Sequence, residues 1–199
     1  PAKIHHPDSK HVICEHCRVI ERGWHVLSFN DVIESVWLPN VTSVGRCTFS
    51  NYERLTHISL PVVESIGGYA FYMCSSLLSV SLVAHELGES AFTFCRRLRT
   101  VSLPFAPFAS TNLFDDCDEL ESVSMPIATE VRHCAFAGCS SLTEVSLPAV
   151  RRVDDGGFVS CRTLESVSLP MLDSVERSAF SDCPRLSKER ILAPEHVKN

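Results

Sequence analysis

The sequence has 199 residues, of which 45% are hydrophobic and 21% are charged, and its formal net charge is −6 at pH 7. This apolar content is sufficient for a continuous core, so the composition excludes an intrinsically disordered chain. The acidic balance and the lack of a Lys/Arg block argue against a nucleic-acid partner, because phosphate binding requires a basic surface. No apolar run approaches the roughly 20 residues that span a bilayer. The first residues also lack the apolar segment of a signal peptide.

The N-terminal segment, residues 1–26, does not follow the pattern of the rest of the chain. It is polar and rich in histidine, and it predicts an irregular N-terminal cap. Its one motif is His-x-x-Cys-x-x-Cys, formed by His11, Cys14 and Cys17. Imidazole and thiolate are zinc ligands, and further histidines lie nearby at His5, His6, His16 and His25.

Zinc is nevertheless the weaker interpretation of this motif, because no second Cys-x-x-Cys or His-x-x-His pair follows at a fixed distance. We therefore predict no metal and no cofactor, and we expect a reduced, partly buried cap. A thioredoxin-like use of the two cysteines is disfavoured further, since no βαβ pattern surrounds them.

Residues 27–186 consist of one repeated pattern, A-F-x-x-C-x-x-L-x-x-V-x-L-P, which is complete in the stretch 135–148. The period is 22 residues, with one copy of 21. The repeat phenylalanines are Phe49, Phe71, Phe92, Phe114, Phe136, Phe158 and Phe180. Fixed spacing over about seven copies indicates a solenoid, in which each copy buries its apolar face against its neighbours.

Three local signals alternate within each repeat. The stretch 142–147, LTEVSL, has apolar residues with a period of two near its end, which predicts a short strand. A proline ends that strand, and a second extended piece follows, with inward residues at Val44, Ile66, Leu87, Ala109, Val131, Val153 and Val175. The segment A-F-x-x-C-x-x-L then suits a turn of α-helix or 3₁₀-helix. The charged residues 187–199 predict a C-terminal cap with a helical turn before Pro194.

Six of the ten cysteines occupy a single position of the repeat: Cys74, Cys95, Cys117, Cys139, Cys161 and Cys183. Residues at one position stack about 4.8 Å apart with parallel side chains. Such a column favours a buried stack of thiols over disulfides, whose Cβ atoms must face each other. Cys47 and Cys134 share another position but lie four copies apart, so we expect them not to pair.

The string I-G-x-x-A-F-x-x-C-x-x-L-x-x-I/V-x-L-P, seen from Ile66 to Leu82 and from Val131 to Pro148, resembles the BspA-type leucine-rich repeats. The resemblance covers about Leu27 to Leu186. It implies a curved right-handed α/β solenoid with a parallel sheet along one face. It also implies binding of proteins rather than catalysis, since the characterised relatives include bacterial surface adhesins.

The residues between the inward positions of the first strand should line the exposed face of this sheet. Most carry hydroxyl groups. The candidate partner-binding residues are Trp37, His57, Ser59, Ser79, Ser81, Thr100, Ser102, Ser122, Ser124, Glu144, Ser146, Ser166 and Ser168. They predict either a polar platform with Trp37 as an aromatic anchor or merely a strand face that tolerates only small residues. For Trp37, packing under the N-terminal cap is the favoured alternative.

No Ser or Cys has a nearby base that the repeat does not already explain, so we predict that the chain is not an enzyme. Arg96, Arg97 and Arg99 face Asp115, Asp116, Asp118 and Glu119 one copy later, which indicates ion pairs between repeats. Exposed pairs of this kind contribute only about 0–1 kcal/mol each.

These observations predict a protein-interaction module that binds another protein through the sheet face or an edge of the solenoid. The expected role is a scaffold or a subunit of a larger cytoplasmic assembly. The alternative is a secreted or surface adhesin-like protein whose targeting segment is absent from this sequence.

Overall fold

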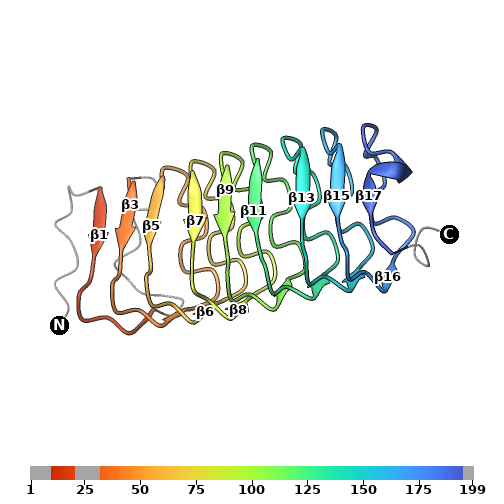
Figure 1. The fold of residues 1–199 in the computed structure, drawn as a ribbon. Helices are drawn as coiled ribbons and strands as arrows, with labels where there is room; N and C mark the ends of the chain where they lie inside the picture. The colour runs from red at the N-terminus through yellow and green to blue at the C-terminus, as the bar shows by residue number, and fades with distance from the viewer. Residues whose placement is uncertain (1–9, 21–31, 195–199) are drawn as a thin grey trace.

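The computed structural model describes residues 10–20 and 32–194. These residues form a solenoid of about eight turns, in which each turn contributes two short strands (Figure 1). The first strands are β1 (His11–Ile13), β3 (Ser35–Trp37), β5 (His57–Ser59), β7 (Ser79–Ser81), β9 (Thr100–Ser102), β11 (Ser122–Ser124), β13 (Glu144–Ser146), β15 (Ser166–Ser168) and β17 (Ile191–Leu192). The second strands are β2 (Val19–Ile20), β4 (Ser43–Val44), β6 (Ser65–Ile66), β8 (Glu86–Leu87), β10 (Phe108–Ala109), β12 (Glu130–Val131), β14 (Arg152–Val153) and β16 (Ser174–Val175).

The strands pair in parallel and in register with the repeat, so that equivalent residues lie side by side. Val101 of β9, for example, pairs with Val80 of β7 and with Val123 of β11. Because alternate side chains of a strand point to opposite faces, the central Val is directed inward and its two neighbours outward. The predicted solenoid, its parallel sheet and its inward columns are therefore confirmed.

The N-terminal residues 10–20 form a further turn of the solenoid. Strand β1 pairs with β3, strand β2 pairs with β4, and Val12 and Ile20 are buried in the shared core. The prediction of an irregular cap is wrong for these residues. The prediction failed because residues 10–20 lack the repeat Phe and the Pro that ends the strand. A strand can form without them, since it requires only apolar residues at its inward positions.

The C-terminal residues also continue the sheet. A 3₁₀ turn, η2 (Lys188–Arg190), precedes β17, which pairs with β15. The helical turn expected before Pro194 is thus present. Ile191 pairs with Val167, 24 residues earlier, so the last copy carries two more residues than the 22-residue period.

The core is built around the column of repeat phenylalanines. Consecutive rings from Phe49 to Phe180 are nearly parallel, with centroids 5.1–5.7 Å apart. The rings from Phe49 to Phe158 have no exposed surface. Offset stacking of this kind adds to the hydrophobic contribution of burying each ring.

The predicted cysteine column is confirmed as a stack of free, buried thiols. Each thiol donates a hydrogen bond, 3.1–3.3 Å long, to the carbonyl oxygen of the Phe one turn earlier, as Cys139 does to Phe114. Burial raises the pKa of the Cys95 and Cys139 thiols, so both stay protonated and able to donate. The Cys position thus joins neighbouring turns as well as filling space.

The segment A-F-x-x-C-x-x-L forms no helix, and the described residues contain no α-helix at all. The residues two before and two after each Phe generally have positive φ, as at Tyr69 (57°) and Met73 (58°) around Phe71. A left-handed residue interrupts a right-handed helix. As a result, alternate N–H groups point to the next repeat. The N–H groups of Tyr69, Phe71 and Met73 donate hydrogen bonds to the carbonyl oxygens of Glu89, Ala91 and Thr93. The prediction of a helical turn in this segment is therefore wrong.

Candidate functional site

The outward residues of the first strands lie on one face of the solenoid, as the sequence predicts. In register, Ser81 pairs with Ser102 and Ser102 with Ser124, and further along Ser146 pairs with Ser168. Most of the candidate residues are exposed, while Ser102, Ser166 and Ser168 are half-buried. We call this surface the serine face; it consists of the candidate residues given above.

The serine face is divided into three sections by two breaks in strand pairing. The sections are β1-β3-β5, β7-β9-β11 and β13-β15-β17. In the strands before the breaks, the inward residues Ile58 and Val123 are only half-buried, whereas Val101 and Val145 are 3% and 6% exposed. The breaks therefore open the sheet toward the core.

A hollow of about 540 Å³ lies over the second break, between β11 and β13, and extends across β15 to Leu192 of β17. Its lining combines inward valines, outward hydroxyls, two glutamates and Leu192 of β17. Of these residues, Glu144, Ser122, Ser146, Ser166 and Ser168 belong to the predicted set. Glu121, Val123 and Leu192 do not, because nothing in the repeat pattern indicates where strand pairing stops.

Trp37 lies at the N-terminal end of the serine face, paired with Ile13 on one side and Ser59 on the other. Its side chain is 42% exposed, so the favoured expectation that it packs under a cap is wrong. On the next strand, His57 is exposed and its Nδ1 lies 2.8 Å from Thr56 Oγ1. The two aromatic side chains distinguish this end of the face from its hydroxyl-rich middle.

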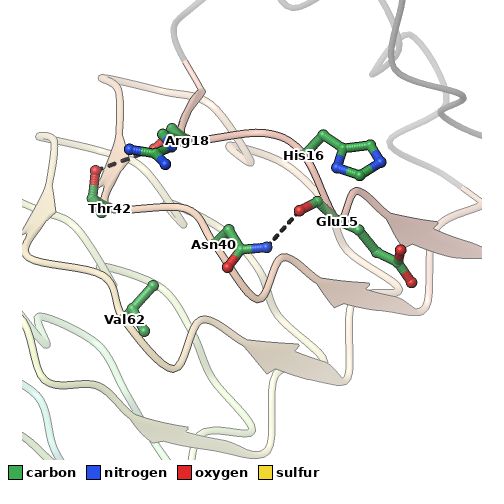
Figure 2. A pocket seen from close by; sticks show the side chains of 6 residues that line it. All are labelled: Glu15, His16, Arg18, Asn40, Thr42 and Val62. Carbon is green, nitrogen blue, oxygen red and sulfur yellow. Dashed lines mark hydrogen bonds between the residues drawn. The ribbon is translucent and has the colours of Figure 1, made fainter.

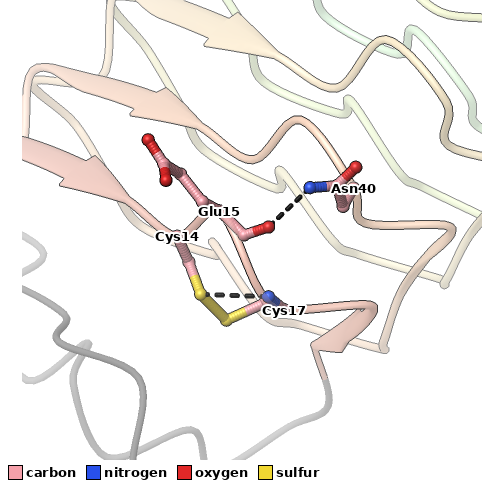
Figure 3. The surroundings of a disulfide bond; sticks show 4 residues. All are labelled: Cys14, Glu15, Cys17 and Asn40. Atoms are coloured by element: carbon pink, nitrogen blue, oxygen red, sulfur yellow. Dashed lines mark hydrogen bonds between the residues drawn. A yellow bond between two sulfur atoms is a disulfide. The ribbon is translucent and has the colours of Figure 1, made fainter.

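The expectation that Cys14 and Cys17 are reduced is wrong. Cys14 and Cys17 form a disulfide, and the N–H of Cys17 lies 3.2 Å from Cys14 Sγ (Figure 3). Two sulfur atoms bonded to each other cannot serve as thiolate ligands. His11 instead contacts Ser35 Oγ through Nδ1 at 2.7 Å. His5, His6 and His25 lie outside the described residues.

A second hollow, of about 490 Å³, is lined by residues that follow the first strands of the first three turns (Figure 2). Glu15, His16 and Arg18 line it from the first turn, and Asn40, Thr42 and Val62 line it from the next two turns. Asn40 Nδ2 donates to the Glu15 carbonyl at 2.5 Å, and Thr42 Oγ1 donates to the Arg18 carbonyl at 3.3 Å. These bonds attach the loop that contains the disulfide to the solenoid.

The predicted ion pairs between turns form in two cases. Arg96 lies 3.9 Å from Asp118, and Arg99 lies 2.9 Å from Glu119. Asp115 forms no such pair and is half-buried; burial raises its pKa to about 6, the Asp116 carboxylate adds to the rise, and His133 opposes it. A raised pKa alone does not define a catalytic site.

A row of exposed apolar residues escaped the sequence prediction. Val62, Phe105, Ile127 and Met171 are each between 43% and 48% exposed. Each directly follows the proline that ends a first strand. Their shared position after the proline could have predicted this exposure from the sequence, because the repeat pattern places this corner of each turn outside the core.

The geometry and the sequence together define a class of protein with stacked, parallel, 22-residue repeats. The family model of the BspA type leucine rich repeat region matches residues 27–126 and 108–199, with six copies. The chain therefore belongs to the BspA-type leucine-rich repeat family. Proteins with leucine-rich repeats bind other proteins, and members of this family are typically binding modules rather than enzymes.

Solved structures of bacterial leucine-rich repeat proteins share the fold. A protein from Eubacterium ventriosum has a TM-score of 0.70 and 23% identity, over 75% of this chain and 42% of that one. The leucine-rich repeat protein of T. pallidum has a TM-score of 0.50 and 22% identity, over 95% and 89% of the two chains. A protein from Bacteroides ovatus has a TM-score of 0.51 and 16% identity, over 87% and 70%. At these identities the likeness concerns the fold alone.

No curated protein sequence matches the chain. Among the described residues, no helix has the length and apolar character needed to cross a membrane.

Proposed function

We propose that the chain is a non-enzymatic protein-interaction module whose binding surface is the serine face. One observation carries the proposal: the outward residues of the first strands form an exposed, in-register surface of short polar side chains. Short side chains allow a partner backbone to approach closely. The sheet face of a solenoid is also an extended surface, on which contacts from many turns can add up.

Two cellular roles are compatible with a protein-interaction module. The first candidate is a scaffold or subunit of a larger assembly in the cytoplasm. The second is a secreted or surface binding protein, and the Cys14–Cys17 disulfide favours it, because disulfides persist mainly in oxidising compartments. Trapping the native protein with a thiol reagent before lysis would decide between them: alkylated Cys14 and Cys17 support the cytoplasm, and an intact disulfide supports the second candidate.

The direct test of the serine face is affinity capture of the tagged protein from its native cell, with quantitative mass spectrometry. A variant carrying Ser81→Lys, Ser124→Lys and Ser168→Lys places three long cations on the face. A matched control carries Thr129→Lys, Ser174→Lys and Ser181→Lys, which add the same charge at exposed positions elsewhere. We expect the wild type and the control to capture a stoichiometric partner, and we expect the face variant to lose it. A partner retained by all three proteins would contradict the proposal.

A further inference from the structure

We propose that the hollow between β11 and β13 is the specific binding cleft of the serine face, and that it takes an extended peptide segment with a basic residue near an apolar one. This inference rests on the proposed function, since it places the contact within the same face. We call this hollow the β11/β13 cleft; it is lined by Glu121, Glu144 and the residues around them.

Strand pairing is missing beneath the β11/β13 cleft. Elsewhere on the face, Leu103 N–H donates to Ser124 O and Leu147 N–H donates to Ser168 O. The equivalent bond from Met125 N–H to Ser146 O is absent, and β11 and β13 form no ladder although they lie side by side (Figure 1). The backbone groups of Met125 and Ser146 that lack this bond lie at the break under the cleft, where polar groups can orient a bound segment.

The floor of the cleft is partly apolar. Val123 is the inward residue of its strand but is only half-buried, so it adds apolar surface to the cleft, whereas Val145 and Val167 are 6% and 1% exposed. Leu192, which is 57% exposed, adds an apolar wall from the last strand. The apolar surface of Val123 and Leu192 within a hydroxyl-rich rim fits one aliphatic side chain of a partner, since burial of such a side chain supplies the affinity and polar groups orient it.

The cleft also carries negative charge from two glutamates. Glu121, which directly precedes β11, and Glu144, the first residue of β13, are both exposed, and no basic side chain of the described residues forms an ion pair with either. Arg99 interacts electrostatically with Glu121, but its guanidinium donates both of its hydrogen bonds to Glu119. Elsewhere in the array, glutamates such as Glu165 are paired, in this case with Arg185. Two unpaired carboxylates beside an apolar floor are complementary to Lys or Arg.

Together these features describe the ligand. In an extended segment, residues two apart point to the same side, so an aliphatic residue seated against Val123 and Leu192 directs its i−2 and i+2 neighbours along the rim. One of these neighbours would reach the carboxylates. The chosen probe is a fluorescein-labelled peptide, Gly-Arg-Thr-Val-Thr-Arg-Gly, in which either direction of the chain can present an Arg.

The test is fluorescence anisotropy of this probe with the full chain. We expect saturable binding that weakens at least tenfold in the double variant Glu121→Gln, Glu144→Gln, because both changes keep shape and remove charge. The matched control, Glu165→Gln, occupies the position equivalent to Glu121 two turns later and should stay within twofold of the wild type. A probe with Glu in place of Arg should not bind, and one with Gly in place of Val should bind at least fivefold more weakly.

Equal binding to the wild type and the double variant would overturn the proposal, and so would equal binding of the Val and Gly probes. Amide chemical shifts give an independent readout: the probe should shift Met125 and Glu144 more than Leu103 and Ser79, and the reverse would contradict the assignment. The capture experiment separates the two proposals. A partner lost with the face variant but retained by the double variant refutes the cleft alone, whereas a partner retained by the face variant refutes the proposed function.

Discussion

The two long sides of the solenoid are built from the same repeat but differ in continuity. On the Phe–Cys side, the ring stack runs without a gap from Phe49 to Phe180 and a thiol-to-carbonyl bond joins each pair of turns from Phe49 to Cys183. On the serine face, strand pairing stops twice and leaves three sections. Cohesion between turns therefore lies mainly on the Phe–Cys side.

This difference shows which positions the fold constrains. A residue of the Phe–Cys side contacts equivalent residues in both neighbouring turns, so a change there affects the whole array. A residue of the serine face contacts solvent, and its identity can follow the needs of a partner. Each prediction below tests one part of this contrast.

The largest effect is expected from Phe136→Ala, in the middle of the ring stack. Removing a fully buried ring leaves a cavity and should lower the free energy of unfolding by about 3–5 kcal/mol. The gap should also uncouple the two halves of the array, so that thermal unfolding followed by circular dichroism shows two steps. A single transition at the wild-type temperature would contradict this prediction.

A smaller loss is expected from Cys139→Ala, because the carbonyl of Phe114 loses the thiol donor and keeps only the N–H of Cys117. The net contribution of one such hydrogen bond is about 0.5–1.5 kcal/mol. Cys139→Ser keeps a donor at the same place and should be less destabilising. Urea unfolding of both variants measures the difference, and Cys134→Ala serves as a control at a half-buried position outside the column. Equal losses for the Ala and Ser variants at Cys139 would show that the hydrogen bond contributes nothing.

A pH-dependent effect is expected from Asp115→Asn. The folded pKa of Asp115, about 6, lies above the ordinary value of 3.8, so the folded state binds more protons between these values and stability falls as pH rises through this range. The variant should therefore melt at a higher temperature than the wild type above pH 6 and at nearly the same temperature at pH 4. Solvent screening at this half-exposed site should keep the gain below about 1 kcal/mol. A gain of the same size at pH 4 would refute the electrostatic cause.

The smallest effect is expected from Ser146→Ala on the serine face. Its side chain is exposed, and such substitutions usually change stability by no more than about 0.5 kcal/mol. Chemical denaturation would measure this change. A loss comparable to that of Cys139→Ala would mean that the face, too, holds the turns together.

Much of the fold could be predicted from the sequence because a period of 22 residues repeats every contact of one turn in the next. The strand positions, the inward columns and the unpaired state of the cysteine column all follow from that period. The alternation around Val145 likewise places Glu144 and Ser146 on the outer face. These features depend only on spacing and on which side chains are apolar.

Other features depend on interactions that spacing does not report. The left-handed residues around each Phe include Tyr69, Phe94 and Cys134 as well as glycines, so no residue type marks them and the segment reads as helical. The turn formed by residues 10–20 lacks the Phe and Pro of the repeat. Pairing of Cys14 with Cys17 depends on how this turn folds. The break between β11 and β13 has no counterpart in the sequence, since SVS and EVS match the other strands.

The measurement that tests the contrast most directly is residue-resolved amide hydrogen exchange of the folded protein. The amides of Phe114 and Phe136 bond to the next turn on the Phe–Cys side and should be the most protected. On the serine face, Leu103 and Leu147 should be protected while Met125, which lacks the equivalent bond, exchanges much faster. Equal protection of Met125, Leu103 and Leu147 would contradict both the sectioned sheet and the cleft that depends on it.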